Sequence, residues 1–353
     1  MRTLNVLLAL TAASAAIACS DISTEPAVDP APTTSLCGPS PAGVSVGGIG
    51  AIGDASATPV RRVILMGGSS EDDDASRIFA EGAGGGDVLI MRASGSTTSY
   101  PAYFINTLTP SPEPASAVTV RIDSPAAGAT AGVLCRVTNA EAIWLAGGSQ
   151  WDYLGLWPSI LHDSLSAATA RGVPIGGTSA GAMSLGEGTF DAESGTVTSA
   201  EALANPHRPD VSVSLSPFAQ PELAGIVVDS HFMQREREGR LLTFLAHFSR
   251  LRNGDPAVGV GLDERVALII DQGRFTVHGP SGRAVWVYRT PGISDLPTGE
   301  ALSMGIVQRV RLEPGQSGEW PLDFGAVVST PLEVQGGVVT AGQPSGAESH
   351  DER

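Results

Sequence analysis

The sequence VPIGGTSAGAMSL at residues 173–185 places Ser179 in the kind of turn that exposes a nucleophilic hydroxyl between a strand and a helix. Its first three residues are apolar and predict a buried strand, whereas its last six can begin a helix. Gly177 and Gly181 lie two residues on either side of Ser179, where a strained turn needs positions without a Cβ atom. The pattern favours a serine hydrolase over a glycine-rich helix start in which Ser179 only caps the helix.

Short apolar runs that alternate with amphipathic stretches indicate an α/β fold. The runs are bounded by glycine or polar residues, as is typical of strands buried on both faces of a parallel sheet. The predicted strands are residues 63–66, 88–91, 118–122, 143–146, 173–175 and 226–228, and the predicted helices include 75–81, 100–108 and 159–170. Closer runs at 259–262, 266–270, 275–278 and 284–288 predict antiparallel hairpins that close the sheet and continue into a β-rich tail.

The N-terminus has the pattern of an export signal. Residues 1–18 combine Arg2 with an apolar stretch that is too short to remain as a membrane span. The sequence AIAC at 16–19 resembles a bacterial lipobox and predicts lipidation of Cys19. Prolines and small polar residues then predict a flexible tether over 19–57. The expected location is a membrane-anchored lipoprotein that faces the periplasm or the exterior, with soluble secretion as the alternative.

The cysteines and the charge exclude several classes of site and partner. Cys37 and Cys135 can form a disulfide in an exported protein or remain as two unpaired thiols. Because no Cys-x-x-Cys motif is present, a structural zinc site is not expected. The formal net charge is −16 and there is no Lys/Arg tract, which argues against nucleic acid as a partner.

A nucleophilic serine needs a general base, and His231 is the best candidate. It directly follows the predicted strand at 226–228, with Asp229 two residues before it. The base in turn needs a carboxylate to orient it, and Asp263 and Glu264 are the candidates at the end of another strand. The other histidines lie in predicted helices, a loop, a hairpin and the tail: His162, His207, His247, His278 and His350.

Four ordered blocks of the sequence resemble the signature blocks of cyanophycinases, which are serine peptidases of the S51 type related to aspartyl dipeptidases. The resemblance extends from about residue 61 to residue 270. The blocks are AIWLAGGSQ at 142–150, GTSAGA at 177–182, DSHF at 229–232 followed by Arg235, Arg237, Gly239, Arg240 and Leu241, and GVGLDE at 259–264.

The resemblance implies a flavodoxin-like three-layer α/β/α sandwich, as in class I glutamine amidotransferases. It implies that Ser179 is the nucleophile, His231 the general base and Glu264 the acid that orients the base. It also implies an oxyanion hole formed by the N–H groups of Gly148 and Ala180. The positions that match substrate-binding residues of the family are Gln150, Asp229, Arg235, Arg237 and Arg240. No cofactor and no metal ion are expected.

The three arginines suit a substrate that carries carboxylates, because planar guanidinium groups bind carboxylates with two hydrogen bonds. Asp229 and the acidic run at 71–74 would then meet an arginine of the substrate. On a regular helix, Arg235 and Arg237 would point about 200° apart. If the resemblance holds, the segment just after His231 is therefore predicted to be irregular, with Arg240 exposed on the helix that follows. The competing interpretation is a solvated helix face on which Glu236 and Arg240, four residues apart, form an ion pair.

The expected organisation divides the chain into five parts. They are a signal peptide at 1–18, a lipidated Cys19 with a tether at 19–57, a peptidase domain at 58–292, a β-rich extension at 293–340 and a disordered tail at 341–353.

The favoured function is an exported serine peptidase that hydrolyses cyanophycin or related β-linked aspartyl-arginine peptides. Two alternatives are an isoaspartyl or aspartyl dipeptidase of the same family and a non-catalytic lipoprotein binding module. The presence of all three triad residues disfavours the binding module. The expected partners are a peptide or the cyanophycin polymer and, through a lipid anchor only, a membrane. A homodimer is among the oligomeric states left open.

Overall fold

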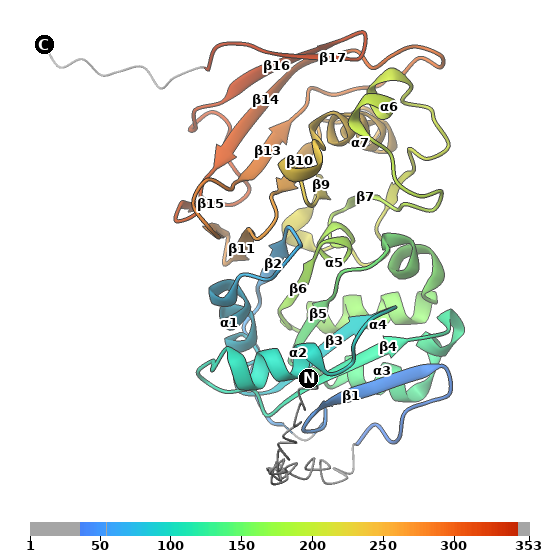
Figure 1. Ribbon diagram of the computed structural model, residues 1–353, viewed down its shortest axis with the longest axis vertical. Helices are drawn as coiled ribbons and strands as arrows, with labels where there is room; N and C mark the ends of the chain where they lie inside the picture. Colours follow the sequence, from blue (N-terminus) through green and yellow to red (C-terminus); the bar gives the residue numbers. More distant parts are fainter. Residues whose placement is uncertain (1–35, 54, 345–353) are drawn as a thin grey trace, which may run out of the picture. The chain divides into compact units, whose positions relative to one another are not determined.

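Two β-sheets organise the computed structural model, which describes residues 36–53 and 55–344 (Figure 1). The first sheet has nine strands, in the spatial order β1 (Val44–Ile49), β4 (Ser116–Ile122), β3 (Asp87–Arg92), β5 (Ala142–Leu145), β6 (Ile175–Thr178), β2 (Val63–Met66), β11 (Ala267–Asp271), β12 (Arg274–His278) and β15 (Ser317–Glu319). The second has eight, in the order β17 (Val338–Ala341), β16 (Thr330–Gln335), β14 (Met304–Leu312), β13 (Val285–Arg289), β10 (Val258–Leu262), β9 (Ile226–Asp229), β7 (Gly188–Phe190) and β8 (Val213–Leu215).

The centre of the first sheet is parallel, as the unbroken apolar runs predict. Strands β4, β3, β5, β6 and β2 pair in parallel, and β1 and β11 pair antiparallel at the two sides. Because the carboxyl ends of parallel strands meet at one edge, the chain segments after β2, β5 and β6 lie close together.

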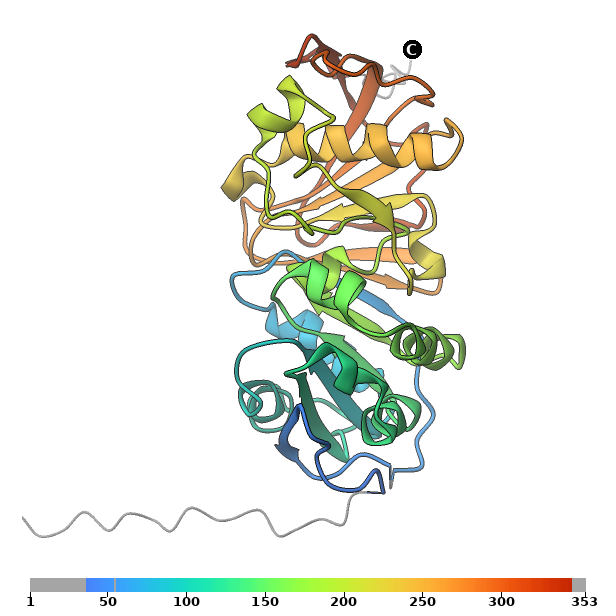
Figure 2. The same ribbon diagram turned by 90° about the vertical axis from the view of Figure 1, so that its right-hand side faces the viewer.

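Helices cover both faces of the first sheet, because alternate side chains of each strand point to opposite sides. Leu65 and Leu145 pack in one apolar cluster with Leu161, whereas Ile64 packs in another with Phe79. The α-helices of the described residues, which pack on the first or the second sheet, are α1 (Asp73–Glu81), α2 (Ser99–Ala102), α3 (Ala131–Thr138), α4 (Ser159–Ala170), α5 (Ala180–Met183), α6 (Ser199–Ala204) and α7 (Glu238–Leu251). Helix α7 lies against the second sheet (Figure 2), with Phe244 and Leu245 in its apolar cluster. In the described part of the chain, no helix is both long enough and apolar enough to cross a membrane.

The mixed α/β class is confirmed, whereas the flavodoxin-like detail is not. The parallel strands follow the order β4-β3-β5-β6-β2, which differs from the 2-1-3-4-5 order of flavodoxin. Strand β9, expected in the same sheet as β6, instead pairs in parallel with β10 in the second sheet. The strands after residue 257 are therefore shared between two sheets, and β11 and β12 form a hairpin in the first.

The expected tether at 19–57 is wrong for its described part. Residues 44–49 form β1, in which Val44 pairs with Ile122 of β4. Cys37 and Cys135 form a disulfide with their Cα atoms 5.4 Å apart. The apolar residues interspersed with glycines in this segment therefore lie in an outermost strand of the first sheet. The signal peptide at 1–18, Cys19 and the start of the tether lie outside the described residues.

The expected C-terminal extension at 293–340 is built into the two sheets. Strand β14 pairs with β13 and is followed by β16 and β17, whereas β15 pairs with β12 in the first sheet. The described residues belong to one compact unit, so the boundaries expected after residues 57 and 292 do not divide it. Of the tail predicted at 341–353, Ala341 ends β17, and residues 345–353 lie outside the described residues.

Replacing both cysteines of the Cys37–Cys135 disulfide with serine should lower the free energy of unfolding by about 2–5 kcal/mol, because the bond closes a long loop in the unfolded chain. The two residues are 98 positions apart in sequence. Urea unfolding of protein produced under oxidising conditions measures the loss. A reductant should cause the same loss in the wild type and none in the double variant; equal stability of all four samples would contradict the prediction.

Candidate active site

Ser179 lies in a strained turn between β6 and α5, with φ 52° and ψ −118°. Its N–H donates to the carbonyl of Met66 at the end of β2, at 3.0 Å. A Cβ atom on Gly181 would lie 2.1 Å from the carbonyl oxygen of Leu145, and one on Gly177 would lie 2.7 Å from the carbonyl carbon of Gly181. The steric reason predicted for the two glycines is therefore confirmed, because strand and helix approach too closely for a side chain.

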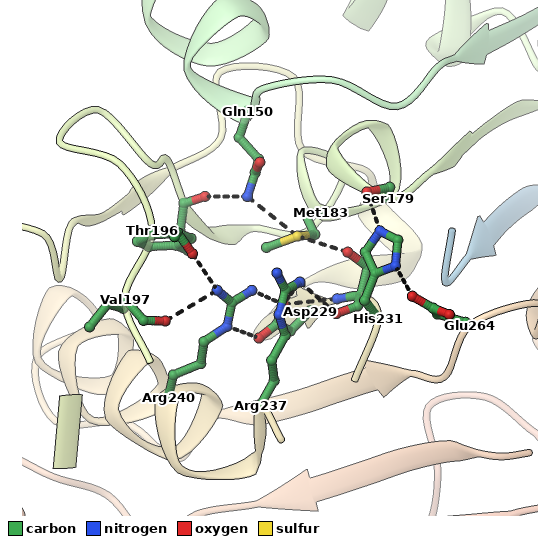
Figure 3. A network of polar contacts seen from close by, with 12 residues as sticks. Gln150, Ser179, Met183, Thr196, Val197, Asp229, His231, Arg237, Arg240 and Glu264 are labelled. Atoms are coloured by element: carbon green, nitrogen blue, oxygen red, sulfur yellow. Dashed lines mark hydrogen bonds and ion pairs between the residues drawn. The ribbon is translucent and has the colours of Figure 1, made fainter. Parts of the chain in front are cut away.

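A chain of hydrogen bonds links Ser179, His231 and Glu264 (Figure 3). Ser179 Oγ lies 2.9 Å from His231 Nε2, and His231 Nδ1 lies 2.8 Å from Glu264 Oε1. Since an ionised carboxylate only accepts hydrogen bonds, Nδ1 carries the proton and Nε2 is free to accept from the hydroxyl. This is the geometry of a nucleophile, a base and an orienting acid.

The surroundings of His231 keep its imidazole neutral. Burial lowers the pKa of His231 below its usual value, and the hydrogen bond to Glu264 partly opposes this shift. The positive charges of Arg235 and Arg237 lower the pKa further. A neutral imidazole can accept the serine proton at neutral pH.

Three successive carbonyl groups at the end of β2 hold the turns that carry these side chains. The carbonyl of Met66 accepts from Ser179 N, that of Gly67 accepts from His231 N at 2.9 Å, and that of Gly68 accepts from Arg265 N at 3.0 Å. A Cβ atom on Gly68 would lie 2.6 Å from both Cε1 and Nε2 of His231. Sequence reasoning missed this role, because a Gly-Gly pair after a strand is more often an ordinary tight turn.

The residues predicted for the oxyanion hole lie beside Ser179. Gly148 lines the same cavity as Ser179, and Ala180 is the next residue and the first of α5. Within the described residues, no hydrogen bond from the N–H of Gly148 or Ala180 is present, which leaves both donors free for an oxygen of a substrate.

Ser179 opens into a cavity of about 480 Å³ whose wall is rich in arginine. Arg235, Arg237 and Arg240 all line it, together with the segment at 195–199. Gln150 also lines it, and its Nε2 lies 3.3 Å from Met183 Sδ and 3.5 Å from the carbonyl oxygen of Phe190. The structure thus brings Gln150 and the three arginines to one side of Ser179.

Asp229 is fully buried and is bonded within the chain. Its Oδ2 accepts from Arg240 Nε at 2.8 Å, and its Oδ1 accepts from Arg240 Nη2 at 2.5 Å and from Ser230 N at 2.9 Å. Arg237 Nη1 lies 3.4 Å from the same Oδ1. The carboxylate therefore binds these arginines and is not open to an arginine of a substrate.

The exposed helix face expected for Arg240 is wrong. Only 2% of Arg240 is exposed, and its guanidinium carbon lies 5.4 Å from the ring centre of Phe190 and 5.6 Å from that of Phe244. Its Nη1 also donates to Thr196 Oγ1 at 3.2 Å. The sequence places Arg240 near the start of a helix, but it does not show that the side chain pairs with Asp229. The expected exposure of Arg240 was wrong for this reason.

The irregular segment predicted after His231 is confirmed. A 3₁₀ turn spans Met233–Arg235, Glu236 has φ 52°, and α7 begins only at Glu238. Arg235 and Arg237 can therefore both reach the cavity. Arg237 donates from Nη1 to the carbonyl of Ser230 at 2.7 Å, and burial lowers its pKa to about 10, which leaves it charged at neutral pH.

The acidic run at 71–74 lies apart from this cavity. Glu71 accepts from Tyr100, Asp73 accepts from Tyr103, and Asp72 caps α1 through Ala75 N at 2.9 Å. The four residues line a different hollow with Arg265. Asp263, the other carboxylate considered as the orienting acid, instead accepts from Met233 N at 3.1 Å and from Ala284 N at 3.0 Å.

No protein-family model matches the chain, and no curated protein matches it. The chain is similar to the crystal structure of a peptidase from an acI-B1 Actinobacterium, with 16% identity and a TM-score of 0.49 over 75% of this chain and 99% of that one. It is also similar to a "Putative Peptidase E Protein" from Listeria monocytogenes EGD-e, with 12% identity and a TM-score of 0.40 over 63% of this chain and 99% of that one.

Replacing Arg240 with methionine should lower the free energy of unfolding by about 3–5 kcal/mol, because the buried Asp229 carboxylate would lose its main partner. Replacing the exposed Arg235 with methionine is the matched control and should change stability by less than about 0.5 kcal/mol. Urea unfolding of both variants measures the difference, and equal midpoints would contradict the buried pair.

Proposed function

We propose that this chain is a serine peptidase of the cyanophycinase type, which hydrolyses β-linked aspartyl-arginine peptides. The observation that carries the proposal is the hydrogen-bonded chain of Ser179, His231 and Glu264, of which Ser179 and His231 line a cavity with three arginines. The four sequence blocks that resemble cyanophycinases support the same activity.

The proposed reaction proceeds through an acyl-enzyme. Ser179 Oγ attacks the scissile carbonyl carbon while His231 Nε2 takes the hydroxyl proton. The N–H groups of Gly148 and Ala180 would stabilise the oxyanion of the tetrahedral intermediate. His231 then gives its proton to the leaving amine as the C–N bond breaks. A water molecule then attacks the acyl carbon while His231 Nε2 takes its proton. The bond between this carbon and Ser179 Oγ breaks, His231 returns the proton to Oγ, and the acid product leaves.

The charges of the cavity favour an anionic part of the substrate. Arg235 has no ion-pair partner among the described residues, and Arg237 uses Nη1 for contacts within the chain. We therefore assign substrate carboxylates to Arg235 and Arg237, with Gln150 as a further polar partner in the same cavity. Asp229 and Arg240, expected to touch the substrate, are assigned instead to holding this wall in place.

A dipeptidase of the same family is the second candidate. The cavity volume of about 480 Å³ lies in the range of small-molecule sites, so a dipeptide could fill it. A polymer would need to enter by one end or run across the mouth of the cavity.

Wild-type protein incubated with cyanophycin should release β-Asp-Arg, which mass spectrometry identifies.

Ser179→Ala and His231→Ala should each lower turnover by roughly five to six orders of magnitude, because triad residues act as a unit. Glu264→Gln should lower turnover by less. Hydrolysis of β-Asp-Arg and α-Asp-Arg but not of the polymer would favour the dipeptidase. Near-normal activity of Ser179→Ala would contradict the triad, and absence of any hydrolysis would favour the binding module.

We also propose that the protein is exported and anchored through lipid on Cys19, on the basis of the lipobox-like sequence at 16–19. Wild-type protein should incorporate labelled palmitate and fractionate with membranes, because two or more acyl chains hold a protein stably on a bilayer. Cys19→Ser should abolish both properties. A soluble, unlabelled wild type would favour simple secretion.

A further inference from the structure

The turn that follows His231 is bonded residue by residue to the turn that carries Glu264. Phe232 N donates to the carbonyl of Leu262 at 3.0 Å, and Met233 N donates to the carboxylate of Asp263 at 3.1 Å. The side chain of Gln234 continues the series, with Oε1 accepting from Glu264 N at 2.6 Å. Three successive residues of one turn thus contact three successive residues of the other.

Gln234 contacts the backbone of Glu264, whereas His231 contacts its side chain. The carboxylate of Glu264 points to His231 Nδ1, whereas its backbone N–H points to Gln234. The 3₁₀ turn Met233–Arg235 lets the Gln234 side chain reach Glu264, and Gln234 does not line the cavity beside Ser179. An effect of Gln234 on the reaction would therefore be exerted through Glu264 and not through the substrate.

The Glu264 turn needs such a partner because its backbone is strained. Arg265 has φ 65°, which a residue with a side chain rarely adopts, and its N–H is held by the carbonyl of Gly68. Asp263 is almost fully buried on the other side and is fixed by two backbone N–H groups. Glu264 lies between these two fixed points with a partly exposed carboxylate, and its own N–H group is held by Gln234.

We propose that Gln234 is a positioning residue that holds Glu264 at hydrogen-bond distance from His231. This inference rests on the proposed serine-hydrolase function. Gln234 should therefore increase the reactivity of Ser179 only when the Glu264 side chain is present. A residue that only stabilises the fold would not show this dependence.

The test measures the second-order rate constant for phosphonylation of Ser179 by a fluorophosphonate, which needs no peptide substrate. This reaction forms an O–P bond, breaks the P–F bond with release of fluoride, and passes the hydroxyl proton to His231 Nε2. Gln234→Leu removes the acceptor and keeps a side chain of similar size. It should slow labelling about tenfold, within the ~10²-fold that a 1 Å misplacement can cost. In a Glu264→Ala background, the same substitution should slow labelling less than about twofold, because the side chain to be positioned is gone.

Gln316→Leu is the matched control, because Gln316 Oε1 accepts from Glu313 N at 2.8 Å in an exposed turn before β15. It should leave the labelling rate unchanged. Urea unfolding of each variant shows whether it is folded at the assay temperature. If Gln234→Leu is not folded at that temperature, two other variants take its place in the same comparison. Gln234→Ala lacks the acceptor oxygen, whereas Gln234→Glu keeps it.

The outcomes separate the inference from the proposed function. Equal slowing by Gln234→Leu in both backgrounds, or no slowing in the wild type, overturns the positioning role. Labelling of wild-type Ser179 without release of β-Asp-Arg from cyanophycin overturns only the proposed substrate. Failure to label wild-type Ser179 at all overturns the serine chemistry and the positioning role together.

Discussion

The end of β2 is the constraint on which the candidate site depends. Its last residue and the two glycines after it offer three successive carbonyl groups, which bind the N–H groups of Ser179, His231 and Arg265. These three residues come from three connections that are far apart in the sequence. Because the three carbonyl groups belong to consecutive residues, the turns that carry Ser179, His231 and Glu264 are held to the same short segment. A shift of β2 would move all three together.

A second constraint comes from the buried pair of Asp229 and Arg240. Removing two charges from water costs several kcal/mol per ion, and geometry has to compensate for this cost. Here Asp229 receives two donors from Arg240 and one from Ser230, while the Arg240 guanidinium lies near the rings of Phe190 and Phe244. The pair ties the end of β9 to α7 and to the cavity wall at Thr196.

The features of the site that the sequence predicts are those that depend on local steric limits and on the order of elements along the chain. The glycines around Ser179 encode a close approach of strand and helix, and the position of His231 after a buried strand encodes a place at the sheet edge. Pairings between distant segments are not encoded in this way. The pairing of Val44 with Ile122 placed part of the expected tether in a sheet, and the pairing of β9 with β10 created a second one. The burial of Arg240 and the contact between Gln234 and Glu264 likewise depend on partners that no local pattern identifies.

Backbone strain at the site has a definite place in this architecture. Ser179 and His231 have φ values of 52° and 49°, in a region that is costly for residues with a side chain. Such conformations persist only where the surroundings hold them, and here Met66 and Gly67 bind the N–H group of each strained residue. The strain brings Oγ and Nε2 to 2.9 Å, a distance that each turn alone does not determine. The energy stored in the two turns is therefore balanced by the hydrogen bonds to β2, and the contact between serine and histidine is formed before any substrate binds.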